Sequence, residues 1–174
     1  MELHRTEVCE PIEGIAIPVT YIGILRHEGV IRELILGLKY QHQTSHARLL
    51  ARIVVDLCGD VFSTCDLITW APTTDVRIRE RGLDHAEQIA RHVSAMVKIP
   101  AKKLLRRTNV GAQTGSSRQD RLDRPHFVAR PLRRPLVVVV IDDVVTTGAT
   151  FHAAANALAL AGAAHVVCIA PSRA

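Results

Sequence analysis

The most informative part of the sequence is residues 138–150, which read Val138-Val139-Val140-Ile141-Asp142-Asp143-Val144-Val145-Thr146-Thr147-Gly148-Ala149-Thr150. The apolar run that ends at Ile141 is β-branched on consecutive positions, which is typical of a parallel strand buried on both faces. Two acids follow it, and a small, hydroxyl-rich turn around Gly148 leads into an Ala-rich helix. The stretch therefore predicts a central strand, a turn and a helix, with Asp142 and Asp143 at the carboxyl end of the strand.

The sequence on both sides of this stretch alternates between helical and strand patterns. Apolar residues at helical spacing predict helices at 30–38, 49–57 and 86–97, with a break between the first two at 41–45. Asp84 precedes the third helix, and Glu87 three residues later predicts a capped start at Asp84. Short apolar runs predict strands at 67–70, 103–105, 126–129, 136–141 and 166–170. This alternation predicts an α/β fold with a parallel central sheet flanked by helices. We expect one domain over 1–174, made of a helical N-terminal part at 1–62 and an α/β core at 63–174.

Composition argues against several classes of protein. Aromatic residues make up only 3% of the 174 residues, which disfavours a single-strand nucleic-acid binder built on base stacking. The four cysteines stand far apart and form no C-x-x-C pair, which argues against a disulfide framework or a zinc ribbon. The sequence shows neither a secretory signal nor a membrane-spanning stretch. We therefore expect a cytoplasmic protein with reduced thiols that does not insert into membranes.

Positive charge is concentrated in one segment. Residues 102–134 hold ten Lys or Arg and two Asp, so this segment carries +8 while the whole chain carries +5. A basic segment on a slightly acidic body indicates an anionic ligand such as a phosphate, a pyrophosphate or a nucleic acid. A solvated loop is the alternative interpretation of the same charges. Within the segment, residues 106–125 show no apolar period and predict a long loop, which in a compact domain is usually functional or mobile.

The turn after the central strand has the chemistry of a phosphate site. Ligands of open α/β sheets lie beyond the carboxyl ends of the strands, and a helix start offers unpaired N–H groups. Asp142 and Asp143 suit sugar hydroxyls or a hard cation such as Mg²⁺. Both acids face the ligand only if the strand ends before them, because adjacent strand residues point to opposite faces. Two alternatives stay open: acids that merely cap the next helix and pair with arginines, and an unrelated α/β protein such as a response regulator.

The stretch 138–150 resembles the signature of the type I phosphoribosyltransferases, which bind 5-phosphoribosyl-1-pyrophosphate. Three further segments resemble motifs of the ComF/GntX family of phosphoribosyltransferase-like proteins: GVIRELILGLKY at 29–40, RIRERGLDHAE at 77–87 and QTGSSRQDR at 113–121. The resemblance covers residues 21–174. It departs from the family at three points, because many members begin with a four-cysteine zinc ribbon, Asp84-His85 stands where the family has Asn-Gln, and Asp123 stands where it has Asn.

The resemblance implies a type I phosphoribosyltransferase fold with a small N-terminal helical hood, and it implies roles for individual residues. The 5′-phosphate would bind at Thr146, Thr147, Gly148, Ala149 and Thr150. Asp142 and Asp143 would be the catalytic acids that hold the ribose hydroxyls and, directly or indirectly, Mg²⁺. Pyrophosphate would bind at Arg77, Arg79, Arg81, Arg118 and Arg121, because planar guanidinium groups suit phosphate oxygens. Solvated loop residues are the alternative interpretation of these arginines.

The reaction that the resemblance implies is a glycosyl transfer, in which a nitrogen nucleophile displaces pyrophosphate from C1 of the ribose. Some related purine enzymes carry an Asp that acts as a base at the position of Thr146. This chain has Thr there, so its sequence shows no general base. Roles in DNA uptake during natural competence and in nucleoside metabolism both fit the resemblance. The alternatives are a non-catalytic module that binds the phosphosugar and nucleic acid, and a structural partner with a vestigial site. The expected partners are phosphoribosyl pyrophosphate, single-stranded DNA and a second copy of the chain.

Overall fold

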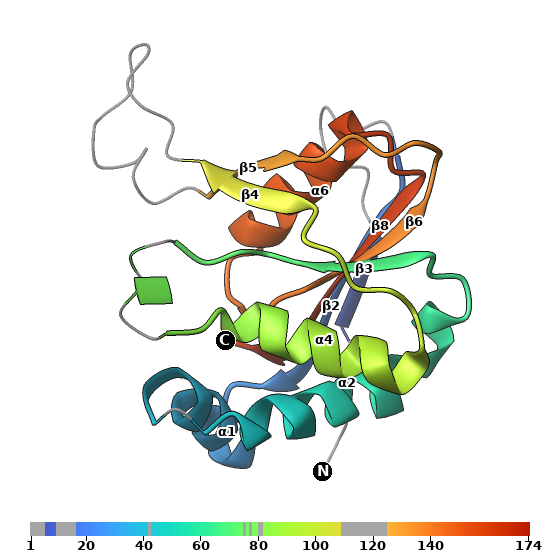
Figure 1. The fold of residues 1–174 in the computed structure, drawn as a ribbon. Helices are drawn as coiled ribbons and strands as arrows, with labels where there is room; N and C mark the ends of the chain where they lie inside the picture. Colours follow the sequence, from blue (N-terminus) through green and yellow to red (C-terminus); the bar gives the residue numbers. More distant parts are fainter. Residues whose placement is uncertain are drawn as a thin grey trace.

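The central sheet of the computed structural model confirms the expected α/β class (Figure 1). The structure describes residues 6–9, 17–41, 43–74, 76, 78–79, 82–108 and 125–174. Its six-stranded sheet has the order β1-β2-β8-β6-β3, and β7 also pairs with β8. The strands are β1 Thr6–Cys9, β2 Val19–Arg26, β3 Leu67–Trp70, β6 Val137–Ile141, β7 Val144–Val145 and β8 His165–Arg173. All pairings are parallel except that of β1 with β2, so the carboxyl ends of β2, β8, β6 and β3 lie at one edge.

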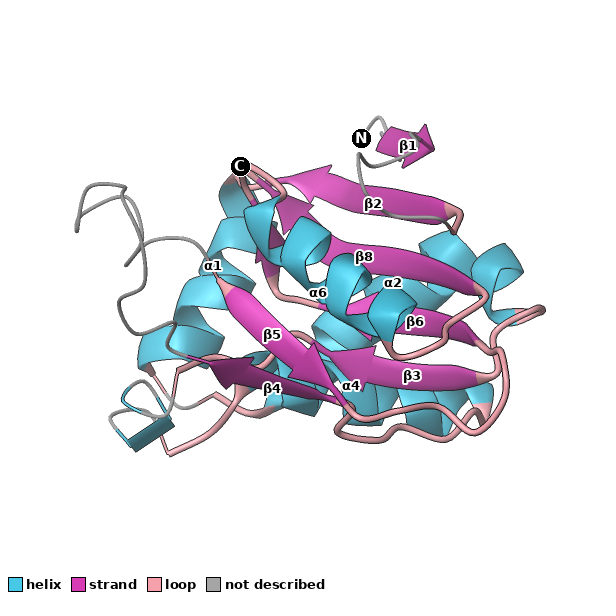
Figure 2. Ribbon diagram, turned by 90° about the horizontal axis from the view of Figure 1, so that it is seen from above, coloured by secondary structure: helices cyan, strands magenta, loops and turns pink. Residues whose placement is uncertain are grey.

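Helices cover both faces of this sheet, as the sequence predicted (Figures 1 and 2). One face is covered by α1 (Gly29–Tyr40), α2 (Ser45–Phe62) and α4 (His85–Val97). The other face is covered by α6 (Ala149–Leu160) and a β-hairpin. The break between α1 and α2 also lies where the sequence predicted it. Within the described part of the chain, no helix has both the length and the apolar content needed to cross a membrane.

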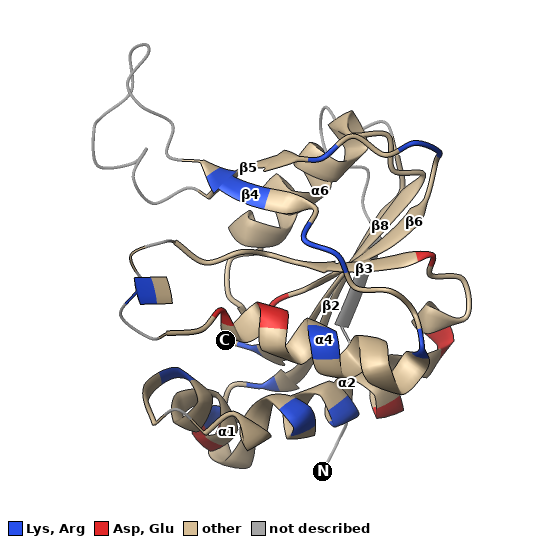
Figure 3. Ribbon diagram, viewed as in Figure 1, with Lys and Arg blue, Asp and Glu red and all other residues tan. Residues whose placement is uncertain are grey.

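The hairpin is a separate antiparallel sheet of β4 (Leu105–Thr108) and β5 (His126–Ala129), and it packs against α6. Basic residues mark β4 in Figure 3. The expected strand at 103–105 is wrong in its bounds, because β4 begins at Leu105 and includes Arg106 and Arg107, which were expected to start a loop. Pairing with β5 decides these bounds, and local apolar content does not reveal that partner. The rest of the expected loop, 109–124, lies outside the described residues.

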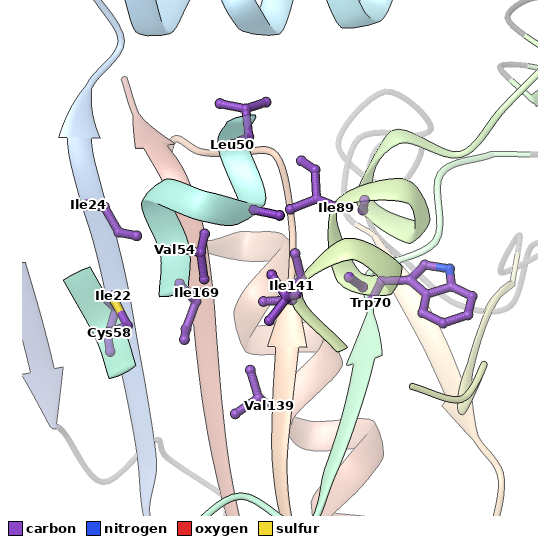
Figure 4. Close-up of a cluster of buried hydrophobic side chains, with 14 of the residues drawn as sticks. Ile22, Ile24, Leu50, Val54, Cys58, Trp70, Ile89, Val139, Ile141 and Ile169 are labelled. Carbon is purple, nitrogen blue, oxygen red and sulfur yellow. The ribbon is translucent and has the colours of Figure 1, made fainter. Parts of the chain in front are cut away.

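Strand β6 is buried on both faces, which confirms the interpretation of its apolar run. Val139 and Ile141 belong to the cluster beneath α1, α2 and α4, whereas Val138 and Val140 belong to the cluster beneath α6. All four side chains are fully buried. Figure 4 shows the first cluster, in which Val139 and Ile141 lie near Ile169 of β8. Because both faces of the sheet are covered, the carboxyl edge is the place where β6 can present polar groups to a ligand.

The N-terminal part supplies strands as well as helices. β2 pairs with β8 inside the central sheet, and β1 extends the sheet beyond β2. Strand β2 is absent from the elements expected from the sequence, although Val19, Thr20, Tyr21 and Ile22 are residue types that favour strands. The division into an N-terminal part at 1–62 and a core at 63–174 stays a prediction.

Helix α1 is held against α2 by a close contact that leaves no room for a side chain. A Cβ atom at Gly37 would lie 2.6 Å from the imidazole of His46, whose Nδ1 donates a hydrogen bond to the Leu34 carbonyl at 3.1 Å. Ile35 and Leu38 on the same helix are buried in the core. This packing determines where the last turn of α1 points, and that turn carries Lys39.

Candidate functional site

Asp142 and Asp143 stand in a break between two short strands. β6 ends at Ile141, β7 begins at Val144, and both pair with β8. The strand therefore ends before Asp142, which is the condition that the binding interpretation needs. The Asp143 N–H donates to Oδ1 of Asp142 at 2.8 Å. This bond between neighbours stabilises a turn that leaves both carboxylates at the carboxyl edge of the sheet.

The turn that follows forms a small cup at the start of α6. A cavity of about 30 Å³ is lined by Asp142, by both residues of β7 and by the predicted phosphate residues Thr146, Thr147, Gly148, Ala149 and Thr150. Gly148 has φ +76°, a conformation that favours glycine. It is the N-cap of α6 and provides no side chain to cap the helix. The Ala149 N–H donates to Oγ1 of Thr147 at 3.4 Å. The later N–H groups of the first turn and the positive end of the helix dipole suit an anion.

A larger cavity of about 400 Å³, which we call the acidic cleft, adjoins the cup. Its ionisable lining residues include Asp84, Asp142, Asp143, Lys39, His27 and Arg107. Asp142, Thr146 and Thr150 line both cavities. The cleft lies at the carboxyl ends of β2, β3, β6 and β8, which is where parallel α/β sheets bind ligands.

Asp142, Asp143 and Asp84 share the acidic cleft with Lys39. The Lys39 Nζ lies 2.8 Å from Oδ2 of Asp143, and the two side chains are 21% and 15% exposed. Burial raises the pKa of Asp142 well above its ordinary value, and the charge of Asp143 raises that pKa further, while Lys39 opposes the shift. The cleft is therefore a site where negative charge is costly and a cation is favoured.

Asp84 ties the loop after β3 to the start of α4. It is the N-cap of α4, accepting a hydrogen bond from the Glu87 N–H at 3.4 Å, as the sequence predicted. Its other oxygen accepts from the Thr73 N–H at 3.1 Å. Burial raises the pKa of Asp84, although both N–H groups oppose the shift. Asp84 thus adds a third acid to the cleft.

A third cavity, of about 1070 Å³, lies between the hairpin and the loop after β3, and we call it the basic cleft. Its charged lining residues are Lys103, Arg106, Arg107 and Arg130. It shares Pro72, Thr73 and Arg107 with the acidic cleft, so the two adjoin. The basic segment 102–134 therefore contributes four cationic side chains to a cavity that adjoins the acidic cleft. None of these four residues was predicted as a site residue from the sequence.

The structure describes one of the five arginines predicted to bind pyrophosphate. Arg79 is exposed, and its neighbour Ile78 lines the basic cleft. The other four, Arg77, Arg81, Arg118 and Arg121, lie outside the described residues. The pyrophosphate role of all five stays a prediction.

His27 is a lining residue that sequence reasoning missed. It follows β2 directly, and its Nδ1 lies 2.8 Å from Oγ of the fully buried Ser172 on β8. A hydrogen bond at one ring nitrogen orients the imidazole and leaves the other nitrogen for the cleft. No local signal marks His27, because β2 itself was not predicted.

The described residues do not fit direct coordination of Mg²⁺. Among them, no group of three His, Cys, Asp or Glu side chains is placed to hold a metal ion. Oδ1 of Asp142 already accepts the Asp143 N–H, and Oδ2 of Asp143 already faces the ammonium of Lys39. Mg²⁺ requires near-octahedral oxygen ligands and gives up water reluctantly, so the carboxylates as arranged suit the lysine better.

Comparison with solved structures finds several similar chains, of which one is described. The chain is similar to the crystal structure of a purine phosphoribosyltransferase from Pyrococcus horikoshii, with 16% identity and a TM-score of 0.42 over 72% of this chain and 82% of that one. No protein-family model and no curated protein matches the sequence. At this level of identity, neither substrate nor activity transfers from that protein to this chain.

Proposed function

We propose that this protein binds 5-phosphoribosyl-1-pyrophosphate at the carboxyl edge of its sheet and transfers the phosphoribosyl group to a nitrogen nucleophile. The observation that carries the proposal is the junction of the two cavities at Asp142, Thr146 and Thr150. An anion cup at a helix start and a carboxylate pair at a strand end together match a ligand with a phosphate and vicinal hydroxyls.

Each part of the ligand has a counterpart in the site. The 5′-phosphate lies on the first-turn N–H groups of α6, and Asp142 and Asp143 accept hydrogen bonds from the ribose hydroxyls. The pyrophosphate faces the cations of the basic cleft, among which Arg107 lines both clefts. Positive side chains stabilise the negative charge that develops on the pyrophosphate as the C1–O bond breaks and the C1–N bond forms.

The nitrogen nucleophile must lose a proton, and we assign its uptake to His27. The sequence shows no base at Thr146, whereas His27 lines the acidic cleft and is oriented by Ser172. An imidazole is the side chain best suited to take up a proton near neutral pH.

A second candidate function is a non-catalytic module that binds the phosphosugar and nucleic acid. The basic cleft favours it, because four cationic side chains line one cavity of about 1070 Å³ beside the phosphosugar site. A role in DNA uptake fits this candidate, and such binding would weaken steeply with salt.

Calorimetry with the phosphosugar and release of pyrophosphate test the proposal and separate the two candidates. We expect one phosphosugar per chain, displaced by ribose 5-phosphate, and pyrophosphate release with at least one member of a panel of bases and amines. Replacing Asp143 by Asn should weaken binding by about 10- to 100-fold, because a charge-assisted hydrogen bond contributes about 1.5–3 kcal/mol. Absence of binding to the wild type rejects the proposal, whereas binding without turnover, together with salt-sensitive DNA affinity, favours the second candidate.

Substitution of His27 by Gln tests the assigned proton acceptor. We expect kcat for pyrophosphate release to fall about 100-fold, the lower end of the usual contribution of general acid–base catalysis. Phosphosugar binding should stay within a factor of about three. His165→Gln is the matched control, because His165 begins β8 and contacts Thr20 at the opposite edge of the sheet. An unchanged kcat in H27Q rules out the assignment.

A further inference from the structure

Lys39 reaches the acidic cleft from an element that the motif of residues 138–150 does not include. It lies in the last turn of α1, whose position depends on the contact between Gly37 and His46. Its ammonium lies 2.8 Å from Oδ2 of Asp143, and both side chains are largely shielded from water. An ion pair in such surroundings is screened less than one on the surface, so Lys39 is a strong local source of positive charge.

A divalent cation bound between the two acids would compete with this ammonium for the Asp143 carboxylate. Lys39 already contacts Oδ2 of Asp143, and Oδ1 of Asp142 already accepts a backbone N–H. A third acid, Asp84, adds negative charge to the same cleft. The cleft therefore needs a cation, and the chain itself supplies one.

We propose that Lys39 takes the place of a divalent cation at Asp143, so that the acidic cleft excludes free metal ions and holds its anionic ligand without one. The first half of this inference concerns the protein alone, and the second half rests on the proposed function. Lys39 acts as a positioning residue: it fixes the Asp143 carboxylate and offsets the negative charge that would otherwise repel a pyrophosphorylated sugar.

Titration of the ligand-free protein with Mn²⁺, followed by electron paramagnetic resonance of the free ion, tests the first half. We expect no binding to the wild type up to millimolar Mn²⁺. Lys39→Met keeps the length of the side chain but removes its charge, and it should gain one Mn²⁺ per chain. The double variant K39M/D143N should lose that ion again, because one of its two carboxylates is gone.

Two further variants separate charge from structure. Lys39→Arg keeps a cation and should exclude Mn²⁺ like the wild type. Lys102→Met makes the same substitution at an exposed lysine that lines neither cleft, and it should also behave like the wild type. One Mn²⁺ per wild-type chain, or no gain in K39M, overturns the proposal, and so does an ion in K39M that survives loss of the Asp143 charge.

Calorimetry with 5-phosphoribosyl-1-pyrophosphate in EDTA and in Mg²⁺ tests the second half. The wild-type affinity should differ by less than about threefold between the two buffers. K39M should bind more than about tenfold more weakly in EDTA, about 1.4 kcal/mol, and should recover with Mg²⁺. A wild type that binds only with Mg²⁺ refutes metal-independent binding. If no variant binds the phosphosugar in either buffer, the proposed function fails, while the Mn²⁺ titration still decides whether Lys39 replaces a metal.

Discussion

Replacement of Asp142 by Asn is expected to stabilise the protein while it weakens binding of the phosphosugar. Burial and the charge of Asp143 raise the pKa of Asp142, so the native state holds its charged form at a cost. Asn has the same shape, and its Oδ1 can still accept the Asp143 N–H. We expect the free energy of unfolding at pH 7 to rise by about 1–3 kcal/mol, the usual penalty of a buried polar group without full compensation. Chemical denaturation measures it.

The pH dependence of stability identifies the cause. A carboxyl group whose folded-state pKa is raised takes up a proton on folding at pH values between its unfolded and folded pKa. The wild type should therefore lose stability as pH rises from the ordinary carboxyl value near 4 through the raised pKa of Asp142. D142N should lose less over the same interval, because Asp84, whose pKa is also raised, still contributes.

In the same variant, D142N, the affinity for the phosphosugar should fall although the stability rises. D142N replaces one acceptor oxygen by an amide donor at the junction of the cup and the acidic cleft. We expect affinity for the phosphosugar to fall by about 10- to 100-fold, because one hydrogen bond to a charged group is lost. A less stable variant would show that the charged form is well compensated in the fold. A variant that binds like the wild type would remove Asp142 from the site.

Replacement of Gly148 by Glu is expected to abolish phosphosugar binding and to leave the fold intact. Gly148 has φ +76°, and a Cβ atom added there meets no other atom within 4 Å. The cost to stability is therefore backbone strain of about 1–2 kcal/mol, partly offset because an acid is favourable at a helix N-terminus. The new carboxylate would repel or replace the phosphate at the first turn of α6. We expect affinity to fall at least about 1000-fold, since several charge-assisted bonds are lost together.

Gly148→Ala is the matched control for this variant. It has the same backbone strain without the charge, so its stability should fall by a similar amount while it keeps most of the affinity. Thermal unfolding and calorimetry of both variants separate the two effects. If G148E binds the phosphosugar as tightly as G148A does, the cup is not the phosphate site.

The local sequence pattern was sufficient to predict the secondary-structure elements around residues 138–150. The consecutive apolar run of β6, the acids after it and the turn at Gly148 each reflect interactions within a few residues, and the structure confirms the strand, its end and the helix. The bounds of β4 and the existence of β2 depend on partners distant in sequence, β5 and β8. The residues of β4 show no clear period, so its bounds could not be read from that segment alone, whereas β2 is rich in strand-forming residues.

The chemistry of the turn after β6 can be read from its residues alone: two acids, hydroxyl side chains and a glycine at the start of a helix. Which other groups meet this turn depends on the tertiary fold. Lys39 arrives from α1, and His27 meets Ser172, 145 positions away in the chain. The physical reason is that parallel strands bring their carboxyl ends to one edge, and their order in the sheet is set by packing of the whole core. Without that order, neither the ion pair at Asp143 nor the imidazole in the cleft can be read from the residues.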